Sequence, residues 1–200
     1  MKIESVTVTR FRHTTNTVRD SDGHGHPGPE SETVSALLTV ATDTGHTGRI
    51  VTRPSDVEEG LLERFVRPNV VGQDPMRTDK LWYAIYKWQR LSGGTLTDRT
   101  LAAVDLALWD LVGKATGQPV WKLLGGHRAK ILAYGSTMCG DDLEGGLATP
   151  EDYARFADWM INMRGYKAMK LHGWMPPVPG APNVKKDYAA CAAVREAVGG

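Results

Sequence analysis

Cysteine is scarce in this 200-residue sequence, and several other features that would identify a class of protein are missing. The two cysteines, Cys139 and Cys191, lie far apart without metal-binding spacing, which favours free thiols in a cytoplasmic protein. No apolar run reaches the roughly 18 residues that a membrane-spanning helix needs. Residues 1–13 alternate like a strand and contain no apolar core of a signal peptide.

Neither sign of charge is in excess, because 24 basic and 23 acidic residues give a net charge of +1. This balance provides no electrostatic attraction for nucleic acid or an anionic membrane surface, so we expect neither as a partner. The glycines form no nucleotide-binding loop, since the GxGxxG pattern is absent. With 41% hydrophobic residues, the chain can nevertheless form a sizeable core.

The first quarter of the chain has the pattern of a small sheet. Alternating apolar and polar residues predict strands over 2–12, 33–42 and 47–52, the last two joined by a hairpin turn at 43–45. Residues 13–32 are polar, with closely spaced Gly and Pro, and predict a loop of about twenty residues.

Three predicted helices follow these strands. Asp56 is the expected cap of a helix over 57–67, and Asp74 with Pro75 is the expected start of another that reaches Leu91. The third helix belongs to the segment TDRTLAAVDLALWDLVGKATGQPVWKLLGG, residues 97–126, which predicts a long amphipathic helix, a stop at Gly and Pro, and a short helical cap. Three strands followed by three helices are typical of an α+β layer.

The pattern changes near residue 128. A strand over 131–136, a helix that starts at a Thr149 cap, a strand over 166–172 and a helix over 183–198 are predicted in turn. Strands that alternate with helices at this spacing indicate parallel βαβ units. Two such units are too few to close a barrel.

Lys170 and His172 are the strongest candidates for chemistry. Alternate residues of a strand share a face, so these two side chains lie together while Met169 and Leu171 pack against helices. They stand at the C-terminal end of the strand, where barrel enzymes have their active sites. The pair could polarise a carboxylate or move a proton. The alternative is a strand end whose two polar side chains simply reach water.

The segment 97–126 and the strand that carries Lys170 resemble the mandelate racemase and muconate-lactonizing branch of the enolase superfamily. The resemblance implies an N-terminal α+β capping domain over 1–128, followed over 129–200 by the first β/α units of a modified TIM (β/α) barrel. It also implies a cytoplasmic, homo-oligomeric enzyme that removes the proton beside a carboxylate through an enediolate stabilised by Mg²⁺. The Mg²⁺ ligands are expected beyond Gly200, and none is assigned within this chain.

Members of this branch often carry Lys-x-Lys at this strand end, whereas here His172 stands in place of the second lysine. This difference favours a dehydratase of a sugar acid, an aldonate or an aldarate. Lys170 would then hold the substrate carboxylate, and His172 would bind it or act as acid or base on the leaving hydroxyl. A racemase, epimerase or cycloisomerase of the same superfamily is the alternative. An alternative of another class is a non-catalytic fragment or an interaction module completed by a partner chain.

Four further residues are candidates for substrate binding. The resemblance assigns 13–32 to a specificity loop, in which His24 and His26 could donate hydrogen bonds to substrate hydroxyls, although a solvated loop with incidental histidines is equally compatible. Arg53 could pair with a second carboxylate or a sugar hydroxyl, or be ordinary surface. Trp174 could form a wall of the site or belong to the core.

Overall fold

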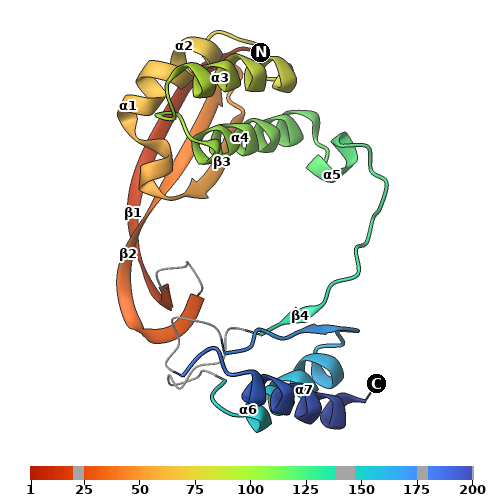
Figure 1. Ribbon diagram of the computed structural model, residues 1–200. Coiled ribbons are helices and arrows are strands. Elements are labelled where there is room, and N and C mark those ends of the chain that lie inside the picture. Colours follow the sequence, from red (N-terminus) through yellow and green to blue (C-terminus); the bar gives the residue numbers. More distant parts are fainter. Residues whose placement is uncertain (20–24, 138–146, 175–179, 200) are drawn as a thin grey trace. The chain divides into compact units, whose positions relative to one another are not determined.

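The computed structural model describes residues 1–19, 25–137, 147–174 and 180–199 (Figure 1). The chain divides into two compact units. The first unit comprises Met1–His13 and Glu32–Ala129, and the second comprises Thr14–Ser31 and Lys130–Gly200. Among the described residues, no helix is both long and apolar enough to cross a membrane.

A three-stranded sheet of order β1–β2–β3 begins the fold, with strands Ile3–Arg19, Gly25–Thr42 and Thr47–Thr52. β2 and β3 are antiparallel, with Ala36 opposite Thr52 at one end of the pairing and Ala41 opposite Thr47 at the other. Gly45 has a φ of 84°, which only glycine adopts readily, and it makes the turn between the two strands. The predicted hairpin is therefore confirmed.

The predicted loop over 13–32 is wrong, because β1 runs on to Arg19 and β2 already begins at Gly25. An ion pair joins the two strands within this polar part of the hairpin, where Arg12 Nη1 lies 2.8 Å from Glu32 Oε2. Pairing with a neighbouring strand satisfies the backbone whether or not the side chains are apolar. The polar composition therefore indicated solvent exposure correctly but not the absence of a strand.

The helical segment after β3 is irregular, and Asp56 is not its cap. Asp56 lies in the short 3₁₀-helix η1, and its Oδ2 accepts a hydrogen bond from Thr52 Oγ1 at 3.0 Å. Pro68 has no N–H for an i→i−4 bond, and a π-helical turn lies directly before α2, the helix that contains it. The segments are η1 (Pro54–Val57), α1 (Glu59–Leu61), η2 (Leu62–Val66) and α2 (Arg67–Val70).

The next helix, α3 (Thr78–Leu91), begins later than predicted. Asp74 Oδ1 accepts from the Met76 N–H at 3.0 Å, so Asp74 closes a turn before the helix instead of capping it. The segment after α3 is as predicted. Helix α4 (Asp98–Thr116) ends at Gly117, whose φ of 63° is left-handed, and the short helix α5 (Val120–Leu123) follows.

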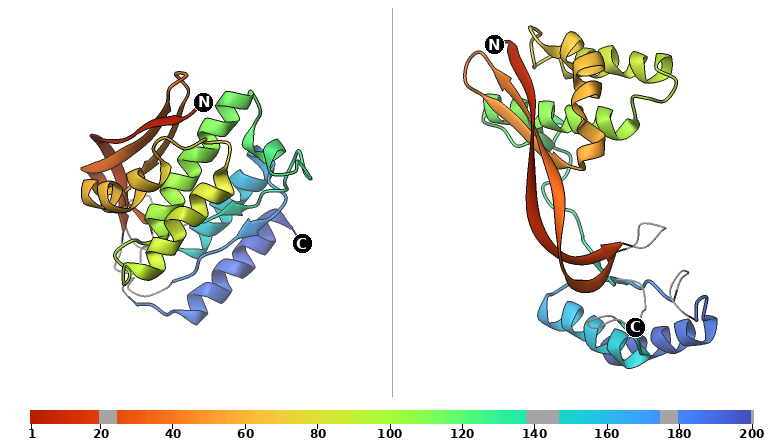
Figure 2. Two further views of the ribbon diagram at one scale, coloured as in Figure 1. Left: turned by 90° about the horizontal axis from the view of Figure 1, so that it is seen from above. Right: turned by 90° about the vertical axis from the view of Figure 1, so that its left-hand side faces the viewer.

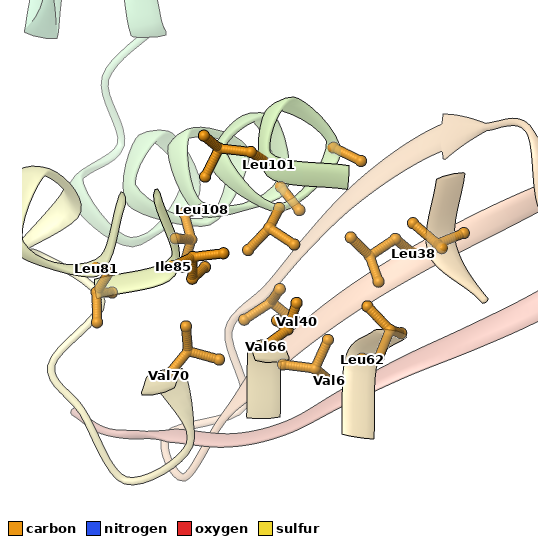
Figure 3. Close-up of a cluster of buried hydrophobic side chains, with 14 of the residues drawn as sticks. Val6, Leu38, Val40, Leu62, Val66, Val70, Leu81, Ile85, Leu101 and Leu108 are labelled. Atoms are coloured by element: carbon orange, nitrogen blue, oxygen red, sulfur yellow. The ribbon is translucent and has the colours of Figure 1, made fainter. Parts of the chain in front are cut away.

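The core of the first unit lies between the sheet and its helices, which cover one face of the sheet (Figures 1 and 2). Alternation along β2 buries Ala36, Leu38 and Val40, while the residues between them remain partly accessible. Each fully buried Val, Leu or Ile contributes about 1.5–3 kcal/mol of transfer free energy, so this face dominates the stability of the unit. Figure 3 shows the side chains that meet there: Val6, Leu38, Val40, Leu62, Val66, Val70, Leu81, Ile85, Leu101 and Leu108.

In the second unit, two short parallel strands, β4 (Gly135–Ser136) and β5 (Met169–Lys170), confirm the predicted parallel pairing. Both strands are shorter than the segments predicted for them. Helix α6 (Pro150–Asp158) continues as the π-helical segment η3 (Trp159–Met163), and α7 (Val184–Val198) packs beside α6.

The helix starts of the second unit follow the predicted caps. Thr149 and Asp152 form a capping box at α6, in which the Thr149 side chain accepts from the Asp152 N–H and the Asp152 carboxylate accepts from the Thr149 N–H. At α7, the Asn183 side chain accepts from the N–H of Lys186 at 3.0 Å. These bonds satisfy N–H groups that have no partner within the first turn of a helix.

A second apolar cluster holds β5 against α6 and α7. Its buried members are Tyr153, Ala157, Trp174, Ala190 and Val194. Met169 and Leu171 pack against this cluster, which confirms that these two residues face the helices. Lys170 and His172 alternate with them along the chain and are therefore left for the side that faces away from the helices.

Candidate functional site

Lys170 and His172 lie side by side, as the strand pattern predicts. Lys170 Nζ is 2.5 Å from His172 Nε2. Lys170 is exposed and His172 is partly buried. Lys170 is the last residue of β5, and His172 follows two residues later, beyond the end of that strand. The structure thus brings the two candidates together, while their catalytic role stays a prediction.

The contact restricts the protonation of His172. A lysine ammonium has only N–H donors, so with Lys170 charged the Nε2 atom of His172 must accept the hydrogen bond. The imidazole is then neutral and carries its proton on Nδ1. In that state Lys170 keeps two further N–H bonds for an anionic ligand. A carboxylate is the simplest ligand that matches such a charged donor beside a histidine.

The backbone around His172 is held by side chains from both neighbouring elements. The His172 N–H donates to Thr137 Oγ1 at 2.8 Å, and the His172 carbonyl oxygen accepts from the Tyr153 hydroxyl. Thr137 directly follows β4, and Tyr153 belongs to α6. Both side chains are buried, at 4% and 0% exposure. The sequence does not reveal this role, because periodicity indicates that Tyr153 faces inward but not which atom its hydroxyl reaches.

The chain just after His172 is fixed from α7. The Trp174 N–H donates to Asp187 Oδ1 at 2.9 Å, and Asp187 lies in the first turn of α7. Gly173 permits this approach, since a Cβ there would overlap Asp187 Oδ1 and lie 2.8 Å from its Cγ. A carboxylate in the first turn is also favoured by the helix dipole. Nothing in the local pattern around Gly173 signalled this contact.

Trp174 lies in the core of the second unit. It is 3% exposed, and its ring centroid is 5.2 Å from that of Tyr153. Lys186 Nζ stands 4.7 Å from the Trp174 ring centroid and donates to the Ala148 carbonyl oxygen at 3.0 Å. Of the two readings of Trp174, its burial favours the core.

The other predicted substrate contacts are not brought to this pair by any described interaction. Arg53 is exposed, belongs to the first unit and is the N-cap residue of η1. His24 lies outside the described residues. The backbone of His26 belongs to β2, and its side chain is likewise outside the described part. The roles of these three residues stay predictions.

No metal site is present among the described residues. Over residues 1–19, 25–137, 147–174 and 180–199, no group of three or more His, Cys, Asp or Glu side chains could hold a metal ion. Within the Lys170–His172 pair, a charged Lys170 cannot be a metal ligand, so only His172 could donate to a metal. A divalent cation needs several ligands. The described part of the chain therefore does not fit a complete Mg²⁺ site.

Comparisons with known proteins agree with the fold. Residues 29–125 match the family model described as "Mandelate racemase / muconate lactonizing enzyme, N-terminal domain". Among solved structures, D-glucarate dehydratase from Agrobacterium tumefaciens complexed with magnesium is similar over 100% of this chain and 52% of that chain, with 56% sequence identity and a TM-score of 0.93.

Two relatives identified by sequence alone are also named as dehydratases. A D-galactonate dehydratase family member of Streptomyces bingchenggensis is 47% identical over 127 residues, which cover 54% of this chain and 30% of that protein. A D-mannonate dehydratase of Novosphingobium aromaticivorans is 35% identical over 121 residues, which cover 60% of this chain and 28% of that protein. The chain thus spans about half the length of the solved relative, and the regions aligned by sequence cover under a third of these two proteins.

Proposed function

Because residues 29–125 belong to the mandelate racemase and muconate lactonizing enzyme family, as its N-terminal domain, we propose that the protein catalyses Mg²⁺-dependent dehydration of a sugar acid. The observation that carries this proposal is the contact between Lys170 Nζ and His172 Nε2 at the end of β5. The names of the relatives support it, since glucarate, galactonate and mannonate are all acids with a hydroxyl beside the carboxylate and another on the next carbon.

The reaction needs two proton transfers. One removes the proton from the carbon beside the carboxylate, and the other delivers a proton to the hydroxyl that leaves as water from the next carbon. The enol that remains becomes a 2-keto-3-deoxy acid, so atoms balance without an oxidant or reductant. Because proton removal puts negative charge on the substrate carboxylate, a positive group beside that carboxylate stabilises the transition state more than the ground state.

In our proposal Lys170 supplies such a group. Its ammonium keeps two N–H donors after bonding His172 Nε2, and these would bind the substrate carboxylate. His172 would bind the substrate beside Lys170 or transfer a proton at the leaving hydroxyl through a ring nitrogen. Mg²⁺, which is bound in the solved relative, supplies Lewis-acid stabilisation of the same charge in such enzymes. Its ligands are not among the described residues of this chain.

The natural length of the protein is first established by its intact mass. The test is then whether the protein of that length turns over a sugar acid. Glucarate, galactonate and mannonate are incubated with Mg²⁺ or with excess EDTA, and the 2-keto-3-deoxy product is measured. We expect a product from at least one acid, with loss in EDTA and recovery on adding Mg²⁺. Formation of an epimer without a keto acid would instead identify a racemase or epimerase. A natural mass of 21.9 kDa without any turnover would favour a non-catalytic module.

A further inference from the structure

His172 lies beyond the end of β5, at the point where backbone pairing with β4 stops. The last described backbone bond between these strands runs from the Thr137 N–H to the Lys170 carbonyl oxygen at 3.0 Å. In a regular parallel ladder the next bond would run from the His172 N–H to the Thr137 carbonyl oxygen. Here Thr137 Oγ1 accepts that bond instead, at 2.8 Å, while the Ser136 hydroxyl donates to the Thr137 carbonyl oxygen at 3.3 Å. At this step of the ladder, a side-chain oxygen of Thr137 therefore accepts the hydrogen bond in place of its backbone oxygen.

The other side of the same residue is fixed from the core. The Tyr153 hydroxyl donates to the His172 carbonyl oxygen, and the Tyr153 ring is fully buried against Trp174. A buried ring has little freedom, so its hydroxyl defines where this carbonyl oxygen lies. Losing either bond would leave a polar group without its partner in a poorly solvated place, which is costly. Both bonds thus oppose rotation of the two peptide groups that flank His172.

We propose that Thr137 and Tyr153 are positioning residues, which hold the backbone of His172 so that its Nε2 meets Lys170 Nζ. The importance of this contact for turnover rests on the proposed function, whereas the positioning itself does not. Lys170 is held by the β4–β5 pairing, and the Thr137 and Tyr153 side chains bond the N–H and the carbonyl oxygen of His172, so their positions help to set where its imidazole lies. A purely structural role, in which the two bonds merely satisfy buried polar groups, is the competing explanation.

The chain offers variants that remove one atom or group at a time. Tyr153→Phe removes the donor to the His172 carbonyl oxygen and keeps the ring, and Thr137→Val removes the acceptor of the His172 N–H and keeps the β-branched shape. Thr137→Ser retains the hydroxyl and is the rescue control. Tyr188→Phe is the matched control for loss of a tyrosine hydroxyl, because Tyr188 lies on α7 and is 75% exposed.

The first measurement does not depend on turnover. In the natural-length protein labelled with ¹⁵N-histidine, the ring nitrogen shifts report the tautomer and the hydrogen bond at Nε2. We expect the wild type, Thr137→Ser and Tyr188→Phe to give a neutral ring with its proton on Nδ1 and a hydrogen-bonded Nε2. In Tyr153→Phe and Thr137→Val we expect the Nε2 shift to move toward that of an imidazole exchanging between tautomers in water.

The second measurement is steady-state kinetics with the best sugar acid. A displacement of about 1 Å in a catalytic group can cost on the order of 100-fold, so we expect kcat to fall about 10- to 100-fold in Tyr153→Phe and Thr137→Val. KM should change much less, because Lys170 still binds the carboxylate. Thr137→Ser should keep kcat within about threefold of the wild type, a change no larger than the net contribution of one weak hydrogen bond.

The outcomes separate the two proposals. Unchanged His172 shifts in Tyr153→Phe, with only a lower melting temperature, would overturn the positioning role and leave a structural one. If Thr137→Val does not fold, Tyr153→Phe decides alone, since its buried ring is retained. If the wild type turns over no sugar acid, the proposed function fails, but the ¹⁵N comparison still decides whether Thr137 and Tyr153 position His172.

Discussion

Gly48 of β3 lies so close to α4 that a Cβ at this position would overlap the carbonyl oxygen of Ala107. It would also stand 2.6 Å from the Cβ of Leu111. Because one of these atoms belongs to the helix backbone, no rotamer change can relieve the overlap. The close packing of α4 on the sheet in the first unit therefore depends on the missing side chain of one glycine.

We expect Gly48→Ala to lower the free energy of unfolding by about 3 kcal/mol or more, at the upper end of the range for overpacked sites. The matched control is Gly60→Ala, since Gly60 lies in α1 with nothing within 4 Å of its added Cβ. There alanine should be neutral or slightly stabilising. Urea denaturation followed by circular dichroism compares the two variants, and equal midpoints would contradict the close packing.

Asp105 of α4 provides a test of pH dependence. Partial burial, and secondly the nearby Asp79 carboxylate, raise the pKa of Asp105 above its ordinary value of 3.8. A raised pKa means that the folded state binds the proton more tightly than the unfolded state does. This carboxyl therefore lowers stability progressively as pH rises from the unfolded pKa through the folded one, and the full penalty remains at neutral pH.

Asp105→Asn should accordingly stabilise the protein at about pH 7, by less than about 1 kcal/mol because the partly accessible carboxylate is screened by solvent. The gain should disappear below the ordinary Asp pKa, where wild type and variant are both uncharged at this position. Melting temperatures measured across this pH range provide the test. A gain that persists unchanged at low pH would point to side-chain packing instead of charge.

The capping box at α6 predicts the opposite pH dependence. Bonds from the Thr149 side chain and backbone, with a smaller contribution from Arg155, lower the pKa of Asp152. Its stabilisation is present above the unfolded pKa and is lost as pH falls through the folded pKa. Thr149→Ala should cost about 1 kcal/mol at neutral pH, and less in acid, while Thr149→Ser should retain most of the stability. Thermal unfolding at both pH values would show whether the cost depends on the carboxylate.

Capping residues in the sequence predicted the helix ends well wherever the contacts that fix those ends lie within a few residues along the chain. Gly117 ends α4 in a left-handed conformation. The side chain of Asn183 caps α7 by accepting a hydrogen bond from the N–H of Lys186, three residues later. Asp56 and Asp74 failed as predicted caps because each carboxylate has another partner close by, the Thr52 hydroxyl and the Met76 N–H. Side-chain preference alone could not choose among these partners.

The long hairpin and the setting of the Lys170–His172 pair depend on contacts between distant segments. Alternation was enough to predict that the side chains of these two residues lie side by side. It could not identify Thr137, which lies 35 positions before His172 and contributes a side-chain oxygen where a backbone oxygen is expected. Nor could composition show that polar residues after His13 continue β1, because the pairing strand decides this.

Lys170 and Lys167 provide a matched pair for testing the proposed site. Both are exposed lysines in the same segment of the second unit, but Lys167 lies in a bend before β5, whereas Lys170 ends that strand beside His172. Replacing either one with Met keeps most of the side-chain volume and removes the charge. General solubility or long-range electrostatic effects should therefore be nearly the same in the two variants.

If Lys170 holds the substrate carboxylate, Lys170→Met should lower kcat/KM by on the order of 10²–10³-fold, as for loss of one stabilising donor at a developing charge. Lys167→Met should remain within about twofold of the wild type, since an isolated surface charge contributes little. Because the carboxylate gains charge in the transition state, part of the loss at Lys170 should appear in kcat and not only in KM. Equal activity of the two variants would place the carboxylate elsewhere and reduce the Lys170–His172 contact to two polar side chains at a strand end.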